Sequence, residues 1–326
     1  MMNKSCIFNG KKERFPEAIE QWMFSEEMRR LVHAFHGTFP ERLSVEEMAK
    51  WLLEFSSRWD YRGMQRQARD AKTGENARWQ VHSFEITDVQ KQVVSEVIVP
   101  LGLLGVCKPL ETKFDYILAL GGARFSCLYR PKYIRELLQE QYAHAREIIL
   151  LSGMRPVADT ERAATDTYAP GAETEYDLMN ASTEQVFHLK RNYHEERYYN
   201  ENKNLEWALR RYDAEIGIPV VSISGPSSEP EKRRANSADT YRFFMEKYCM
   251  EPGRKLLLVT SQIYVPYQQI EAARIFSEMY VETVGFPTEW SAGLQGMMEP
   301  ANYLQEIRSA IQAIHRYLED QLHTRR

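Results

Sequence analysis

The sequence lacks any long uninterrupted run of hydrophobic residues. The longest apolar stretch, VIVPLGLLGVC at residues 97–107, contains a proline and two glycines. It falls well short of the roughly 20 residues that a membrane-spanning helix needs. The N-terminal segment also lacks the apolar core of a secretory signal. We therefore expect a cytoplasmic protein with no membrane partner.

Cysteine is scarce and scattered. Cys6, Cys107, Cys127 and Cys249 form no C-x-x-C pair, and the eight histidines form no convincing set of metal ligands. This pattern disfavours a disulfide framework and a structural zinc site. We expect reduced cysteines and no bound metal.

Positive charge is not in excess. The chain has 42 Lys and Arg against 46 Asp and Glu, a formal net charge of -4, so binding to nucleic acid is not expected. The aromatic and basic stretch at residues 187–212 is interleaved with acids, which favours a solvated amphipathic helix over the site. The part near residues 190–212 is interpreted as an insertion. The expected partner is a small-molecule ligand, and the sequence leaves the oligomeric state open.

Several motifs that would name a reaction are absent. The chain contains no H-E-x-x-H, no G-x-S-x-G and no phosphate-binding P-loop sequence. A dinucleotide fingerprint needs three glycines at G-x-G-x-x-G spacing, whereas Gly121 and Gly122 are adjacent and no third glycine follows. The Gly-Gly pair is therefore either a ligand-cradling turn or a tight turn after a core strand.

Helical patterns occupy the first hundred residues. Ser25 is placed to cap one helix, and Ser44 and Glu47 have the spacing of a capping box before another. Residues 88–104 form a further amphipathic stretch. We predict a helical N-terminal region at residues 1–110.

From residue 114 onward, short apolar runs alternate with helical patterns. The runs are FDYILALGG, EIILLSG, IPVVSISG, KLLLVTS and VETVGFP. Continuous apolar strands that alternate with helices are typical of a parallel sheet covered on both faces. We predict an α/β fold at residues 111–326: a Rossmann-like, mostly parallel sheet with helices on both faces, closed by a long C-terminal helix.

Small residues end four of these strands, which allows a ligand to approach the backbone at the carboxyl edge of the sheet. The residues are Gly121, Gly122, Ser152, Gly153, Ser224, Gly225, Thr260 and Ser261. Since turns use glycine in any case, it is the recurrence at one edge that favours a ligand site over tight turns alone.

Charged and polar residues beside this edge are candidate ligand groups, and each also has a structural interpretation. Arg124 and Arg155 suit phosphate or carboxylate, or pair with nearby acids. Glu175 either holds a ribose hydroxyl or acts as a general base, or it only stabilises the helix through the helix dipole. Glu231 is a candidate for a second acid or base. Arg234, Asn236 and Ser237 lie at a helix start, where they either bind a ligand or only cap the helix. Tyr264 and Tyr267 either stack on a ligand or pack between helices.

The order of these segments resembles the YdcF/SanA-like family, also called domain of unknown function 218, over residues 114–287. The matching positions are Gly121, Gly122, Ser152, Gly153, Glu175, Asn236, Ser237, Thr260 and Ser261, and Glu231 stands near an acid of the family. Two positions depart from the family: Tyr264 stands where it usually has His, and Tyr267 where it has Arg. The resemblance implies a Rossmann-like fold and a nucleotide-like ligand, with S-adenosylmethionine or a nucleotide as the cofactor it suggests.

The resulting hypothesis is an enzyme of small-molecule metabolism that binds a nucleotide-like ligand and performs transfer or hydrolysis, with Glu175 and Glu231 as acid and base. The alternative is a non-catalytic sensor that uses the same site, and the two departures at Tyr264 and Tyr267 favour it.

Overall fold

The computed structural model describes residues 8–9, 14–63, 86–213, 217–248, 250–293 and 299–324. Contacts divide the chain into two compact units. The helical unit comprises residues 1–107, 262–274 and 287–326, and the α/β unit comprises residues 108–261 and 275–286. The C-terminal helix, expected to belong to the α/β domain, groups by its contacts with the N-terminal helices.

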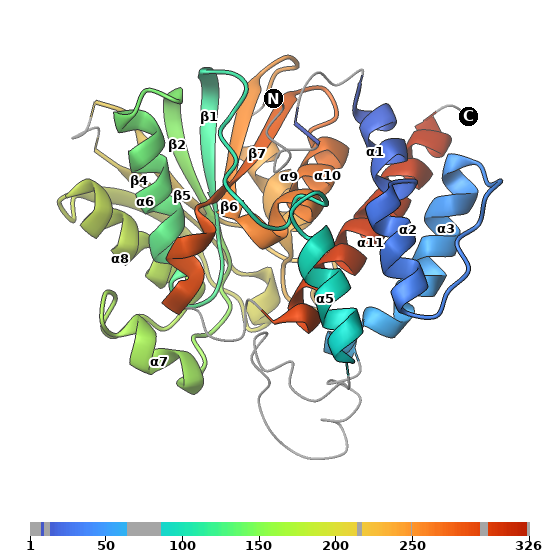
Figure 1. Ribbon diagram of the computed structural model, residues 1–326. Helices are drawn as coiled ribbons and strands as arrows, with labels where there is room; N and C mark the ends of the chain where they lie inside the picture. The colour runs from blue at the N-terminus through green and yellow to red at the C-terminus, as the bar shows by residue number, and fades with distance from the viewer. Residues whose placement is uncertain are drawn as a thin grey trace. The chain divides into compact units, whose positions relative to one another are not determined.

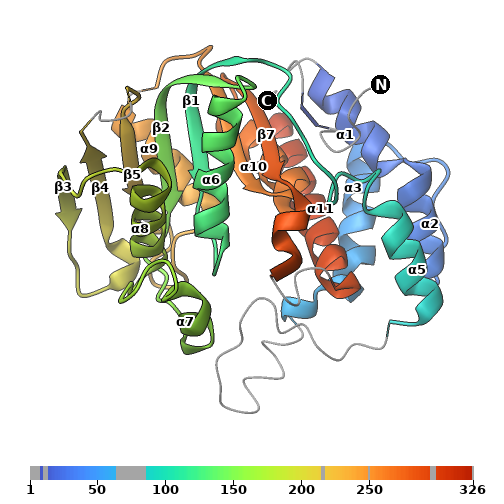
Figure 2. The ribbon, with the colours of Figure 1, turned by 60° about the vertical axis from the view of Figure 1, so that its left-hand side comes forward.

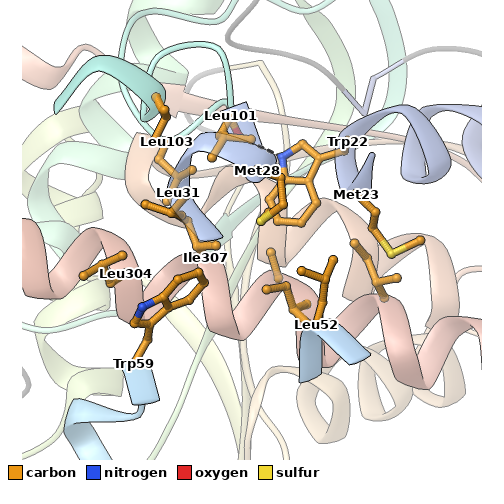
Figure 3. Packing of buried hydrophobic residues seen from close by; sticks show 14 of the residues in the cluster. Trp22, Met23, Met28, Leu31, Leu52, Trp59, Leu101, Leu103, Leu304 and Ile307 are labelled. Carbon is orange, nitrogen blue, oxygen red and sulfur yellow. Dashed lines mark hydrogen bonds between the residues drawn. The ribbon is translucent and has the colours of Figure 1, made fainter. Parts of the chain in front are cut away.

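The helical unit is built around the long C-terminal helix α11. Its elements are α1 (Phe15–Met23), α2 (Glu26–Ala34), α3 (Val45–Phe55), η3 (Ser56–Trp59), α5 (Asp88–Val97), η5 (Gln262–Tyr264), α10 (Val265–Ile275), η6 (Thr288–Gly293) and α11 (Pro300–Thr324). Helix α11 packs on α3 and α5 (Figure 1). Figure 3 shows Trp22, Leu52, Leu304 and other apolar side chains in the shared core, where Trp22 Nε1 donates to the carbonyl of Leu101.

Capping residues start two of these helices where the sequence predicts them. Ser25 Oγ accepts from the backbone N–H of Met28. Ser44 and Glu47 form the reciprocal capping box of α3. Each cap satisfies backbone donors that the first turn of a helix leaves without partners.

The α/β unit contains one seven-stranded sheet in the order β3-β4-β5-β2-β1-β6-β7. Its strands are β1 (Lys113–Leu120), β2 (His144–Ser152), β3 (Tyr193–Tyr198), β4 (Trp207–Tyr212), β5 (Val220–Ser224), β6 (Lys255–Ser261) and β7 (Tyr280–Phe286). The five strands from β5 to β7 are parallel, and β3 and β4 add an antiparallel hairpin at one end. The predicted mostly parallel α/β fold is confirmed.

Helices cover both faces of this sheet (Figure 2). These helices are α6 (Ser126–Gln139), α8 (Glu175–Phe187) and α9 (Ser237–Tyr248), and the short helix α7 (Asp159–Thr165) lies in the connection between β2 and α8. Helices α6 and α8 pack together, α6 against β1 and β6, and α8 against β2 and β5. Helix α9 lies on the other face, where Phe244 and Tyr248 contact the ring of Tyr116 from β1.

The stretch at residues 187–212, expected to form an amphipathic helix, instead begins at the last residue of α8 and contains the β3–β4 hairpin, so that interpretation is wrong. Successive side chains of a strand point to opposite faces of the sheet. In β3, Tyr193, Glu195 and Arg197 therefore share one face. The antiparallel register pairs Glu195 with Arg210 and Tyr193 with Tyr212. These cross-strand pairs favour a strand over a helix, because tyrosine and opposite charges stabilise paired strands.

Arg210 fastens this hairpin to α8. Its guanidinium contacts Glu195 at 2.9 Å and Glu184 of α8 at 3.4 Å, and it lies 3.8 Å from the ring centroid of Tyr193. The Arg210 side chain is only 12% exposed. Tyr212 adds a hydrogen bond of 3.0 Å to Glu184.

Two further observations bear on the sequence analysis. None of the helices within the described ranges is long and apolar enough to cross a membrane. Cys127 carries a free, buried thiol, as expected. Cys107 is disulfide-bonded, so the expectation of reduced cysteines is wrong at that position.

We expect Arg210→Ala to lower the free energy of unfolding by about 3 kcal/mol, because it leaves two largely buried carboxylates without their shared cation. Arg191→Ala is the matched control: Arg191 also pairs with Glu184, but its side chain is 83% exposed. That control should change stability by less than about 0.5 kcal/mol. Urea unfolding measures both, and equal effects of the two variants would contradict this account of the hairpin.

Candidate functional site

Four neighbouring strands end in one row of small residues at the carboxyl edge of the sheet. The register pairs Ser152 of β2 with Ser224 of β5. Continued by one residue from Leu120 and Leu151, it places Gly121 beside Ser152. In the β1–β6 register, Ala119 pairs with Val259, and two residues further along both strands Gly121 lies beside Ser261. The structure therefore brings these four predicted residues together.

The turn after β1 is fixed by a buried arginine. Arg130, on α6 and 2% exposed, donates to the carbonyl of Leu120 at 2.6 Å, to the carbonyl of Gly121 and to Ser261 Oγ at 3.2 Å. A methyl group on Gly122 would lie 2.9 Å from Arg130 Nη1. It would also lie 2.8 Å from Ser126 Cβ, so glycine at this position leaves room for both side chains of α6.

Glu175 lies directly over Gly121. A methyl group on Gly121 would be 2.2 Å from Glu175 Oε1 and 2.8 Å from the Cα of Ser152. Glu175 is the first residue of α8, whose start is tied to the end of β2 because Tyr176 N–H donates to the carbonyl of Gly153 at 3.0 Å. The carboxylate therefore faces the row of small residues on the α6 and α8 side of the sheet.

Arg155 joins Glu175 to a second, buried carboxylate. Its guanidinium contacts Glu175 Oε2 at 3.2 Å and holds both oxygens of Glu161, at 2.6 and 3.1 Å. The Glu161 side chain is fully buried. It also accepts backbone N–H bonds from Arg124 at 3.2 Å and Ala158 at 3.1 Å.

These contacts keep the buried groups charged. Burial alone would lower the pKa of Arg155, but its bonds to Glu161 and its pairing with Glu175 outweigh burial and raise that pKa. Burial opposes ionisation of Glu161, but the bonds from Arg155 and the backbone hold its pKa below the ordinary value. Burial raises the pKa of the nearby Cys127 thiol to about 12, so this thiol stays protonated.

Arg124 has a left-handed backbone with φ of 48°, which is uncommon for a residue with a side chain. Both of its backbone polar groups are hydrogen-bonded. Its N–H donates to Glu161 of α7, and its carbonyl accepts from the hydroxyl of Tyr168, which follows α7. Burial lowers the pKa of its guanidinium. Strained backbone of this kind persists where surrounding contacts fix it.

Buried hydroxyl groups line the strand ends. Among the residues that the structure describes, Ser152 Oγ, Ser224 Oγ and Thr260 Oγ1 have no hydrogen-bond partner. Ser152 is 2% exposed, and Ser224 is fully buried. Both lie in the row of Gly121, and so on the face of Glu175; Thr260 precedes Ser261 and points to the opposite face. A buried hydroxyl without a partner costs about 1–3 kcal/mol.

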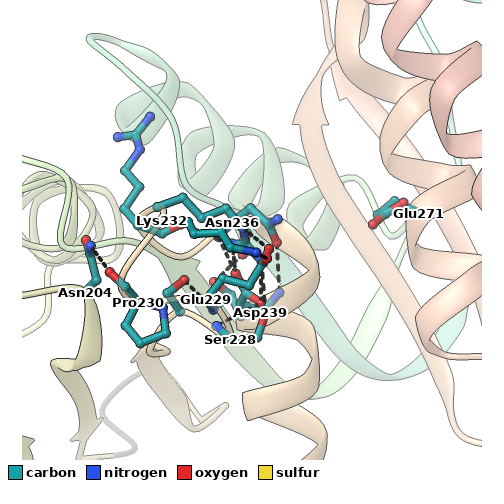
Figure 4. A network of polar contacts seen from close by, with 12 residues as sticks. Asn204, Ser228, Glu229, Pro230, Lys232, Asn236, Asp239 and Glu271 are labelled. Atoms are coloured by element: carbon teal, nitrogen blue, oxygen red, sulfur yellow. Dashed lines mark hydrogen bonds and ion pairs between the residues drawn. The ribbon is translucent and has the colours of Figure 1, made fainter.

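The loop after β5 is organised by Asp239 of α9 (Figure 4). Asp239 accepts from the backbone N–H groups of Ser228 and Asn236, and it pairs with Arg233. Asn236 caps α9 by accepting from Asp239 N–H at 3.1 Å, in agreement with the capping interpretation.

The other residues of this loop that were predicted as ligand groups do not gather at one point in the described structure. Gly225 is buried against Phe243, and Ser237 begins α9. Arg234 is exposed. Glu231 is also exposed and accepts from Asn202 Nδ2 at 3.1 Å, so the structure shows no contact between it and Glu175. The proposed pairing of two catalytic acids therefore has no geometric support in the described residues.

Tyr264 and Tyr267 belong to the helical unit. Both are half-buried and pack against its hydrophobic core. This placement matches the interpretation of the two side chains as helix-packing aromatics.

Glu161 and Arg130 belong to the candidate site but were not predicted from the sequence. The signal for Arg130 was available, because it stands among Cys127, Ile134 and Leu137 on the buried face of α6, where a charge needs a specific partner. Glu161 had no comparable signal: it lies in a short polar helix, and its role comes from contacts with residues distant in sequence.

Comparisons with known proteins identify relatives over nearly the whole chain. The chain matches the Rv3785 N-terminal domain family at residues 7–102. It is 32% identical over 322 residues to the mycobacterial proteins named "Uncharacterized protein Rv3785" of Mycobacterium tuberculosis (strain ATCC 25618 / H37Rv) and "Uncharacterized protein Mb3814" of Mycobacterium bovis. These alignments cover 93% of this chain and 89% of each relative. No solved structure matches the chain.

The chain therefore belongs to the Rv3785 family. This membership overturns the resemblance to the YdcF/SanA-like family, and the suggestion of S-adenosylmethionine loses the support it took from that resemblance. The shared motifs were Gly-Gly, Ser-Gly and Thr-Ser strand ends, a capped helix and an acid at a helix start. Any parallel α/β sheet favours such residues at these points, so their order was not specific to one family.

The network predicts a definite pH dependence for Glu161→Gln. Because the pKa of Glu161 is lowered in the folded state, its contribution to stability is complete above the ordinary value of 4.5 and is lost as the pH falls through the folded pKa. We expect Glu161→Gln to cost about 3 kcal/mol near pH 7 and progressively less below about pH 4.5.

Urea unfolding across this pH range measures the difference between the two proteins. Glu173→Gln is the control, because Glu173 is exposed and precedes α8. It should stay within about 0.5 kcal/mol of the unmodified protein throughout. A cost for Glu161→Gln that does not change with pH would contradict a lowered pKa of Glu161 in the folded protein.

Proposed function

We propose that the chain is an enzyme of small-molecule metabolism that binds a nucleotide-like ligand at the carboxyl edge of its parallel sheet. The observation that carries the proposal is the row of Gly121, Ser152, Ser224 and Ser261 with Glu175 over its centre. In open α/β sheets, ligands bind outside the carboxyl ends of the strands at the point where the strand order reverses.

The strand order supports this location. Chain order runs from β1 outward through β2 to β5, and then returns to β6 on the other side of β1. The reversal therefore lies between β1 and β6, whose ends are Gly121 and Ser261. Arg130 bonds to both of these residues and holds the two strand ends in place.

Glu175 is the proposed functional carboxylate. A glutamate beside a strand end can accept hydrogen bonds from ribose hydroxyls, as acidic residues do in dinucleotide-binding folds. It can also remove a proton from a ligand hydroxyl as a general base. Arg155 orients the carboxylate from the side away from Gly121, because it bonds Oε2 while Oε1 lies over the glycine. The proposed chemistry is transfer to, or hydrolysis at, the bound ligand.

A non-catalytic ligand sensor is the second candidate, and the placement of Glu231 favours it. The exposed Glu231 is bonded to Asn202 rather than directed toward Glu175. A reaction that needs separate acid and base groups would have to use another residue or the ligand itself. Turnover of a bound ligand separates the two candidates.

A thermal-shift screen tests the binding proposal. The panel contains adenine and uridine nucleosides and nucleotides, with S-adenosylmethionine and S-adenosylhomocysteine as further adenosine compounds. A ligand specific to the folded state, at a hundredfold excess over its Kd, adds about 2.7 kcal/mol of stability. We expect the midpoint to rise by roughly 2 °C or more for at least one compound.

We expect Glu175→Gln to weaken the best compound by at least about tenfold in calorimetry, because the amide loses one acceptor and the negative charge. Glu173→Gln, two residues earlier and exposed, should leave the affinity unchanged. A flat response across the whole panel would reject the nucleotide-like ligand. Equal weakening by the two variants would reject the assignment of Glu175.

A further inference from the structure

We propose that the ligand meets the Gly121 edge through an uncharged hydrogen-bond donor, such as the hydroxyls of a sugar, and not through a phosphate. This inference rests on the proposed function and specifies which end of a nucleotide-like ligand lies at the site. Two independent observations carry it: one backbone donor at the start of each of three helices at this edge already holds a carboxylate of the chain, and the groups that face the strand ends are a carboxylate and buried hydroxyls.

The first observation concerns the starts of α6, α8 and α9. Sites that bind phosphate at a helix start use its backbone N–H groups as donors. Here Glu161 accepts from Arg124 N–H in the turn before α6. At α8, Asp177 accepts from Thr174 N–H at 2.9 Å, and at α9, Asp239 accepts from Asn236 N–H at 2.9 Å.

Each of these internal carboxylates occupies one backbone N–H from which a phosphate oxygen would accept a bond. Glu161 has an additional partner, because the guanidinium of Arg155 donates hydrogen bonds to both of its carboxylate oxygens. The Gly-Gly turn therefore does not act as a phosphate cradle in this arrangement. A phosphate there would have to displace a fully buried glutamate.

The second observation concerns the groups that face the row. Glu175 Oε1 lies over Gly121, and an ionised carboxylate only accepts hydrogen bonds. Ser152 and Ser224, in the same row and at least nine-tenths buried, have hydroxyls without a partner in the described ranges. A carboxylate beside two hydroxyls matches adjacent sugar hydroxyls, which both donate and accept, and it repels a phosphate.

Calorimetry with three probes tests the inference: adenosine, adenosine 5′-monophosphate and 2′,3′-dideoxyadenosine, with the uridine series in parallel. We expect the nucleoside and its monophosphate to bind within about fivefold of each other, and the dideoxy compound at least about tenfold more weakly. Glu175→Gln should remove most of the difference between the nucleoside and the dideoxy compound.

Serine variants add a readout that separates a binding role from a packing role. Ser152→Ala and Ser224→Ala should weaken the nucleoside by about threefold or more while leaving the unliganded protein at least as stable, because each removes a hydroxyl without a partner. Ser222→Ala is the matched control: its hydroxyl is equally buried and without a partner in the described chain, but it lies two residues further from the edge. It should not change the affinity.

The outcomes distinguish the two proposals. A monophosphate that binds at least about thirtyfold more tightly than its nucleoside, or a dideoxy compound that binds as well as the nucleoside, would overturn this inference and leave the proposed function standing. If no nucleoside or nucleotide binds, the proposed function fails, and this inference fails with it.

Discussion

The candidate site depends on the guanidinium of Arg155, which forms ion pairs with both Glu161 and Glu175. The guanidinium joins the segment after β2 to the buried carboxylate of α7 and to the first residue of α8. Through Glu161 it also holds the left-handed turn at Arg124. A buried charge is tolerated only when partners satisfy it, so loss of any one of the three groups leaves another without compensation. The loops at this edge therefore form one electrostatic unit.

In the proposed function, that unit lets a turn with two glycines meet a ligand without being a phosphate loop. The glycines admit other groups: Glu175 approaches Gly121, and Arg130 approaches Gly122. The chain's own carboxylates take the backbone donors that phosphate uses elsewhere. The groups left at the strand ends are the Glu175 carboxylate and buried hydroxyls. The proposed ligand is accordingly recognised by its sugar rather than by its charge.

The sequence predicted the sheet well because its determinants are local. Short apolar runs that alternate with amphipathic segments indicate buried parallel strands and their helices, and Ser25 and Ser44 mark helix starts by their own side chains. The hairpin at residues 193–212 was missed because its pairing joins residues far enough apart that Glu195 and Arg210 meet only once β3 and β4 align. Glu161 was missed for the same reason. The convergence of Gly121, Ser152 and Ser224 followed from the strand ends, whereas the isolation of Glu231 depends on a contact with Asn202 that no motif encodes.

A crystal structure of the complex with the tightest-binding nucleoside would test the central claim most directly, because it locates the ligand without reference to activity. We expect the sugar hydroxyls within about 3 Å of Glu175 Oε1, at the strand ends beside Gly121 and Ser152. We also expect Arg155 still to bridge Glu161 and Glu175. A nucleoside found away from these strand ends, for example against Tyr264 and Tyr267 of the helical unit, would contradict the account.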